Sequence, residues 1–148
     1  MIKIGYLLIC EDVAYNEDED IHYIKNPLEA VILDKIPSRY NFYMLSSLFN
    51  VNEELEYIVE VEIINPNGES LSNLSTPIVF YSKAPKGKRS TGIITLNIHH
   101  KNFEFKDVGV HKLILKIREE KTGEVSLKEI DFPVLAKETT VIEDEKNE

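Results

Sequence analysis

The sequence has few of the features that cross-link a chain or place it in a membrane. It contains one cysteine, Cys10, and no tryptophan among its 148 residues. A single cysteine cannot form a disulfide within the chain, which fits a reducing compartment. The longest apolar run near the start, residues 4–10, is too short for a secretory signal and far below the roughly 18 residues that span a bilayer. We therefore expect a cytoplasmic protein.

Positive charge is also scarce, with 17 Lys and Arg residues against 26 Asp and Glu residues and a formal net charge of −9. The excess acids lie in residues 11–20 and 137–148, so the rest of the chain is formally neutral. Nucleic acids and anionic membranes both need a positive protein surface. We therefore expect another protein as the partner, rather than nucleic acid or a membrane.

Sequence motifs for catalysis are missing as well. The chain contains no Gly-x-Ser-x-Gly elbow, no His-Glu-x-x-His helix and no dinucleotide-binding fingerprint. We accordingly expect neither a cofactor nor catalytic residues, and an enzyme is the least favoured class of function.

The clearest positive signal lies between residues 110 and 134. Leucine or isoleucine occupies positions 113, 115 and 117, while lysine or arginine occupies positions 112, 116 and 118. This period of two predicts a strand with one buried face. The polar residues 119–122 and Gly123 can close a hairpin, and the β-rich run 125–134 returns.

The return strand changes its apolar parity. Val125 and Leu127 alternate on one parity, whereas Ile130, Phe132 and Val134 alternate on the other. A register change would reconcile the two sets, so we predict a β-bulge near residues 128–129. A strand buried on both faces is the alternative.

Strand-like runs recur through the rest of the chain, separated by turn signals such as Asn-Pro-Asn-Gly at 65–68. Residues 28–36 are ambiguous, because Pro27 favours a helix start whereas Val31 and Ile32 favour strand. We predict strand, and the alternatives are a strand after one helical turn and a helix. Eight or nine short strands predict an all-β fold, an antiparallel β-sandwich that is immunoglobulin-like or related. It forms one domain, residues 1–136, followed by a disordered acidic tail, 137–148.

Several of these signals occur together in a known group. They are a first strand ending in Cys10-Glu11-Asp12, a strand closed by Ile36-Pro37, an aromatic strand after it, the 65–68 hairpin and the run from Gly109 to His111. Over residues 1 to about 136 the chain resembles a family of small uncharacterised bacterial and phage proteins. The resemblance implies a β-sandwich and leaves function open.

The acidic segment 11–20 is one candidate binding site. Asn16, Asp18 and Asp20 have the spacing that begins an EF-hand calcium loop, but Ile21 and Pro27 stand where glycine and glutamate are required. A small-ligand or calcium site of another kind, built from Asp12, Asp18 and Asp20, remains the alternative function.

The histidines and the cysteine favour structural interpretations. His99 and His100 are neighbours in a strand and must point to opposite faces, so we expect no metal site. His100 and His111 follow the apolar parity of their strands, which predicts stacking or hydrogen bonding at the rim of the core. Cys10 also lies on an apolar face and next to acids, so we expect a buried thiol with a raised pKa.

The most distinctive candidate is the basic segment, residues 83–92. It places Lys83, Lys86, Lys88 and Arg89 in an otherwise acidic chain. We interpret it as a loop that contacts an acidic partner, a phosphate group or RNA; a hairpin tip that only balances charge is the alternative.

The function predicted from sequence is therefore a non-catalytic interaction or binding module. The basic segment is its first proposed contact surface, and the aromatic residues Tyr40, Phe42 and Tyr43 are the second. Homo-oligomerisation through a sheet edge is a further open alternative.

Overall fold

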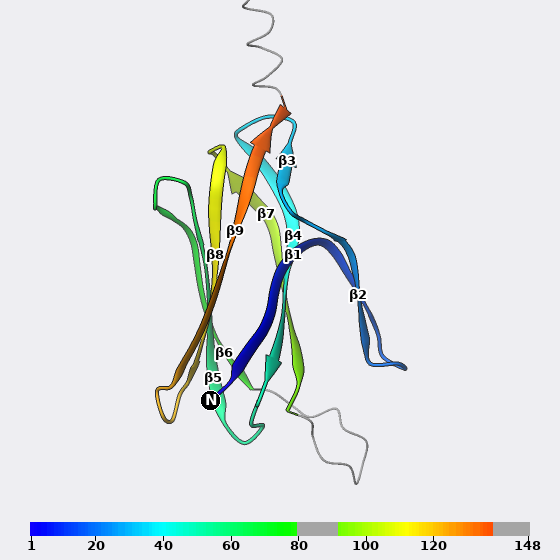
Figure 1. Cartoon of the computed structure of the whole chain (residues 1–148), viewed down its shortest axis with the longest axis vertical. Helices are drawn as coiled ribbons and strands as arrows, with labels where there is room; N and C mark the ends of the chain where they lie inside the picture. Colours follow the sequence, from blue (N-terminus) through cyan, green and yellow to red (C-terminus); the bar gives the residue numbers. More distant parts are fainter. Residues whose placement is uncertain (80–91, 138–148) are drawn as a thin grey trace, which may run out of the picture.

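The chain folds into two packed β-sheets (Figure 1). This computed structural model describes residues 1–79 and 92–137. One sheet has four strands in the order β2-β1-β4-β7, and the other has five in the order β3-β9-β8-β5-β6. The nine strands are β1 (Lys3–Asn16), β2 (Ile21–Pro27), β3 (Val31–Leu33), β4 (Ser38–Phe49), β5 (Glu56–Ile64), β6 (Ser70–Val79), β7 (Ile94–Phe105), β8 (Gly109–Glu119) and β9 (Val125–Ala136).

The predicted all-β sandwich of eight or nine strands is confirmed. The finer expectation of an immunoglobulin-like arrangement stays a prediction, and residues 138–148 of the predicted tail lie outside the described residues. Within residues 1–79 and 92–137, no helix has the length and apolar character needed to span a membrane.

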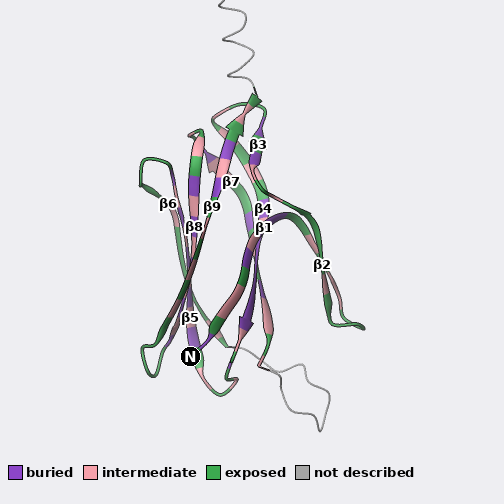
Figure 2. Cartoon of the chain, in the orientation of Figure 1, coloured by how far each residue is buried: buried purple, intermediate pink, exposed green. Residues whose placement is uncertain are grey.

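The core lies between the facing surfaces of the two sheets (Figure 2). In β5, Tyr57, Val59, Val61 and Ile63 are all buried, while the residues between them are half-buried. β8 shows the same alternation and pairs with β5 directly. The period of two read from the sequence therefore identifies the buried face of both strands, because alternate side chains of a strand point to opposite faces.

The β8–β9 hairpin is confirmed, but the predicted bulge is wrong. The two strands pair without a register shift along their whole length. Phe132 and Val134 face the core, whereas Val125 and Leu127 point outward and are 40% and 57% exposed. The change of parity therefore marks two apolar side chains on the outer face, and the strand needs no extra residue to accommodate them.

Residues 28–36 form less strand than predicted. Only Val31–Leu33 is extended, and it pairs with β9 in parallel, the one parallel pairing among the described strands of the predicted antiparallel sandwich. Val31 and Leu33 are buried, while Ile32 is 54% exposed. β3 is short because it is an edge strand: it pairs only with β9, after the chain has crossed from β2 to the five-stranded sheet.

Hydrogen bonds near the N-terminus connect the two sheets. Lys128 Nζ donates to the Gly5 carbonyl oxygen, and Ser126 Oγ donates to the Ile2 carbonyl oxygen, so β9 bonds to a strand of the other sheet. A register shift between Ile4 and Leu7 leaves the Gly5–Tyr6 backbone out of the β1–β4 ladder. A side chain of β4 replaces a missing ladder hydrogen bond, because the Tyr6 N–H donates to Ser47 Oγ at 2.9 Å.

Gly5→Ala is expected to destabilise the fold by about 1–3 kcal/mol, because an alanine Cβ would overlap Ser47 Oγ and lie 2.5 Å from Phe49 Cε2. Urea unfolding followed by circular dichroism measures the change. In a Gly5→Ala/Ser47→Ala double variant the cost should be less than the sum of the single costs, since part of the overlap is removed. Additive costs, or an unchanged free energy of unfolding for Gly5→Ala, would contradict this packing.

Candidate functional site

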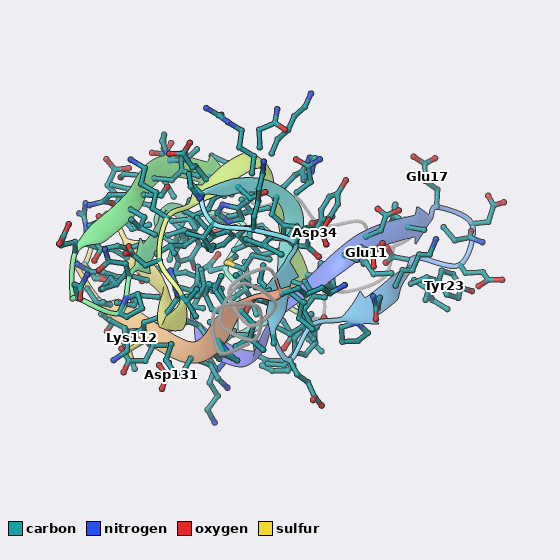
Figure 3. The ribbon with its side chains drawn as sticks, turned by 90° about the horizontal axis from the view of Figure 1, so that it is seen from above. Glu11, Glu17, Tyr23, Asp34, Lys112 and Asp131 are labelled. Atoms are coloured by element: carbon teal, nitrogen blue, oxygen red, sulfur yellow. The ribbon has the colours of Figure 1, made fainter. Side chains whose placement is uncertain are left out.

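The most distinctive surface feature is a two-stranded arm, residues 11–26, that leaves the sandwich (Figure 1). From Lys3 to Cys10, β1 pairs with β4; beyond Cys10 its only described partner is β2. Figure 3 shows Glu17 and Tyr23 at the far end of this arm, away from the body that carries Lys112 and Asp131. The arm is thus a hairpin that neither sheet covers.

The arm exposes apolar side chains among its acids. Ile21 is 45% exposed, Tyr23 50% and Ile24 37%. Residues 11–26 also carry six carboxylates and a single lysine, Lys25. An exposed apolar group with a polar surround is typical of surfaces that bind other molecules.

Side-chain contacts hold the arm in one shape. Tyr23 Oη donates to Glu19 Oε2 at 2.8 Å, and this hydrogen bond to the carboxylate raises the pKa of the Tyr23 hydroxyl. Tyr15 Oη likewise donates to Asp20 Oδ1, and its ring lies 4.7 Å from the His22 ring across the two strands. Isolated two-stranded hairpins are marginal in water, so these contacts explain how the ribbon persists beyond the sandwich.

The tip of the arm, residues 17–20, is a turn. Asn16 Oδ1 accepts the backbone N–H groups of Asp18 at 3.0 Å and Glu19 at 3.2 Å. This is the local side-chain turn that asparagine favours. The tip is therefore a structured turn whose carboxylates project into solvent.

The structure does not assemble the predicted calcium site. Asp12 lies opposite Lys25 in the arm. It is four residues along β1 from Asn16, so Asp12 is about 13 Å from the turn. Asp20 is already engaged by Tyr15. Among the described residues, no group of three or more His, Cys, Asp or Glu side chains is arranged to hold a metal ion.

The two other predicted contact surfaces are the basic segment and the aromatic residues of β4. Lys83, Lys86, Lys88 and Arg89 lie outside the described residues, so the basic segment stays a prediction. The aromatic residues do not form a surface: Phe42 is fully buried, and Tyr40 stacks on it at the end of the core. Tyr43 points to the opposite face of β4 and stacks on His99, with 4.2 Å between ring centroids.

The two inward-facing histidines belong to an aromatic cluster at one end of the core, deeper than the rim position predicted. His100 stacks on Phe42 with ring centroids 4.7 Å apart, and burial lowers its pKa to about 4, with a smaller contribution from the neighbouring His99. His111 is fully buried and stacks on Phe132, 5.7 Å away. Its Nδ1 lies 3.0 Å from the Gly109 carbonyl oxygen, which can only accept, so Nδ1 carries the proton.

Cys10 is a fully buried free thiol, as the sequence predicts. Burial raises its pKa above the ordinary value, and the nearby Asp12 carboxylate adds to the effect. A thiol held protonated in this way is a poor nucleophile, so Cys10 fits packing rather than chemistry.

Sequence reasoning missed the apolar residues of the arm as functional candidates. For Ile21, Tyr23 and Ile24 the sequence predicts no more than one of the recurring strand-like runs, and nothing in it indicates that the strand leaves the body. The available signal was the facing pair of tyrosine-containing strands around an acidic turn, Tyr15 on one and Tyr23 on the other. Only the pairing partners of β1 show that nothing covers them.

A family model described as a family of unknown function, DUF6941, matches residues 5–128. The match confirms the resemblance to an uncharacterised family that the sequence indicated. The search of curated proteins gave no match.

Solved structures that are similar to the chain include three that act on sugars by their names. A β-glucuronidase of Bacteroides uniformis is 12% identical with a TM-score of 0.50, over 88% of this chain and 13% of that one. A Listeria innocua β-glucosidase (8%, TM-score 0.42, 92% and 16%) and a Clostridium perfringens family 123 glycoside hydrolase (13%, TM-score 0.43, 90% and 28%) follow. The chain thus spans less than a third of each solved chain, and the first likeness shows a shared fold alone.

Unfolding should become easier in acid because of His100. Its pKa is about 4 in the folded chain against about 6.5 when unfolded, so between these values the unfolded chain binds more protons. The stability that the neutral imidazole contributes is complete above pH 6.5 and is lost as the pH falls toward 4, by up to about 3 kcal/mol.

Urea unfolding of the wild type and of His100→Phe at pH 7 and pH 4.5 isolates this contribution, because phenylalanine keeps the stacking on Phe42 and cannot be protonated. The pH dependence should be smaller in the variant by on the order of 2 kcal/mol. His22→Gln, in the exposed arm, is the matched control and should behave as wild type. Equal pH dependence in wild type and His100→Phe would contradict the burial of the imidazole.

Cys10 should react with a disulfide reagent such as DTNB only when the fold opens, because its thiol is buried and protonated. Release of the coloured thiolate is expected to be slow in the native protein and immediate in guanidinium chloride. A Cys10→Ser/Val125→Cys variant, with its thiol on an exposed position, serves as the control that reacts at once. Immediate labelling of native Cys10 would show that the site is open.

Proposed function

We propose that this chain, which belongs to the DUF6941 family, is a non-catalytic interaction module that binds another protein through its projecting arm. One observation carries the proposal. The arm extends Ile21, Tyr23 and Ile24 beyond the sandwich, where their apolar surface stabilises no part of the core. A partner that covers them would recover the hydrophobic free energy that the folded chain leaves unused.

The charge of the arm indicates the chemistry of the partner. Its six carboxylates and one lysine would attract a basic surface and repel phosphate backbones. The proposed partner is therefore a protein that presents a basic, partly apolar segment.

The hydrogen bonds of the arm favour binding by a preformed surface. Tyr23 is held by Glu19, and the Glu11 carboxylate accepts from the Asn26 amide at 2.6 Å near the base of the arm. A rigid ribbon loses little conformational entropy when it is bound, so more of the contact energy appears as affinity. The basic segment with Lys83, Lys86, Lys88 and Arg89 is retained as a second proposed contact, for an acidic group on the same or another partner.

Affinity capture with a double variant, Ile21→Ser/Tyr23→Ser, tests the proposal. Wild type and variant are immobilised and exposed to lysate of the native source, and bound proteins are identified by mass spectrometry. A partner bound through the arm should be lost, with affinity reduced on the order of a hundredfold for two buried anchors. It should also elute at raised salt, because an exposed acidic surface is screened.

The matched control is Val125→Ser/Leu127→Ser, which removes two exposed apolar side chains from the outer face of β9. It should capture the same partner as wild type. The proposal fails if the arm variant retains every wild-type partner, or if both variants lose the partner equally. Circular dichroism of each variant confirms that the sandwich itself is unchanged.

A further inference from the structure

The four edges of the two sheets are not equally protected against pairing with another strand. β3 is only three residues long, and the β2 edge carries Lys25 and ends in Pro27. β7 has Lys101 and a register shift against β4. Short strands, charges and irregularities of this kind prevent an edge from adding a foreign strand.

The β6 edge has much less protection. Its ten residues, Ser70–Val79, include no charged side chain, although charged residues make up 29% of the chain. One irregularity lies near its start, where the pairing with β5 shifts register, and Pro77 lies near its end. Residues 72–76 between them form a regular, neutral edge about 17 Å long.

The direction of the backbone groups in β6 follows from its neighbours. The Glu120 N–H donates to the Glu56 carbonyl oxygen at 3.0 Å, so the Glu56 backbone faces β8 and the adjacent Tyr57 backbone faces β6. By alternation, the residues opposite Tyr57, Val59 and Val61 turn their N–H and C=O groups toward β5. The alternate residues Asn73, Ser75 and Pro77 therefore turn their backbone groups to the free edge. Pro77 is accommodated there because the N–H that it lacks is not needed by β5.

One apolar side chain also lies uncovered on the inner face of β6. Leu74 is opposite Val61, which is buried, yet Leu74 itself is 43% exposed. The facing sheet supplies only β1, β4 and β7 to the sandwich because β2 belongs mainly to the arm. β6 therefore extends past the opposing sheet, and its inner face has no described layer above Leu74.

We propose that β6 is a self-association edge that pairs antiparallel with β6 of a second copy of this chain. The strand is suited to pairing with a second copy of itself. It is neutral, so two copies bring no like charges together, and its exposed Leu74 lies near its centre. The acidic arm starts from the opposite side of the sandwich (Figure 1), so the charges that would oppose association remain far apart.

The positions of Leu74 and Pro77 select one two-fold arrangement. With Leu74 on the axis, the two Leu74 side chains meet in a close, non-hydrogen-bonded pair and cover each other. Asn73 of each copy then exchanges hydrogen bonds with Ser75 of the other. This gives about four new backbone hydrogen bonds. Pro77 then limits the pairing at each end, because its missing N–H stops the ladder.

Sedimentation equilibrium of the full chain, from micromolar to near-millimolar concentration, tests the proposal. The expected result is a reversible shift from 17.0 kDa to twice that mass. Ser75→Pro should raise the dimer dissociation constant at least about tenfold, since it removes one outward N–H per chain and leaves the β5 ladder intact. Leu74→Glu should do the same by placing two carboxylates on the axis.

Leu127→Glu is the matched control, because Leu127 is also an exposed leucine of a strand but lies away from β6. This variant should dimerise as the wild type does. A wild-type chain that stays at 17.0 kDa throughout would overturn the proposal, and so would a dimer that both β6 variants leave unchanged. The arm variant Ile21→Ser/Tyr23→Ser should still dimerise, which separates this surface from the proposed partner site.

Discussion

Backbone hydrogen bonding in two sheets of unequal width determines the shape of this protein. Each buried N–H and C=O group must find a partner, and in a sandwich the partner is a neighbouring strand. β1 has β4 beside it only as far as Cys10, yet the strand continues to Asn16. The remaining residues keep their hydrogen bonds by pairing with β2 alone, and this takes the hairpin out of the sandwich. The arm is a direct consequence of that mismatch in strand length.

The same mismatch acts on the other side of the molecule. Because β2 is used mainly in the arm, three strands face a sheet of five, and β6 is left without a complete layer above it. The two surfaces that we propose for binding therefore have one structural origin and lie at opposite edges. They differ in chemistry, since the arm is acidic and aromatic whereas β6 is neutral and rich in hydroxyl groups. An assembly could use both at once without competition.

The local structure could largely be predicted from the sequence. Alternation at Tyr57–Ile63 and at 113–117 identifies strands and their buried faces, because that period follows from backbone geometry alone. The turn at 65–68 closes as its residues predict, with Gly68 at a φ of 84°. The error at residues 128–129 shows the limit of this reasoning. Parity separates two faces of a strand, but only the opposing sheet decides which apolar set is covered.

The candidate site was less accessible to sequence reasoning, because it depends on which strands are neighbours. Charge identifies residues 11–20 as a candidate site, but their distance from the body depends on where β4 stops pairing with β1. The aromatic run 40–43 gave the opposite error. Phe42 and Tyr43 are adjacent in a strand, so they must face opposite ways, one into the core and one toward His99. Aromatic content in a strand therefore does not by itself predict a binding surface.

The central claim is that residues 11–26 form an ordered ribbon whose described strand pairing beyond Cys10 is between β1 and β2 alone. Residue-resolved hydrogen exchange by NMR tests it most directly. Amide groups in the β1–β2 ladder beyond Cys10 should exchange more slowly than those of an unstructured peptide and clearly faster than those of β5 and β8, since the arm can open without disturbing the core. Exchange at unstructured rates would contradict an ordered arm, and exchange as slow as in β5 and β8 would contradict an arm free of the sandwich.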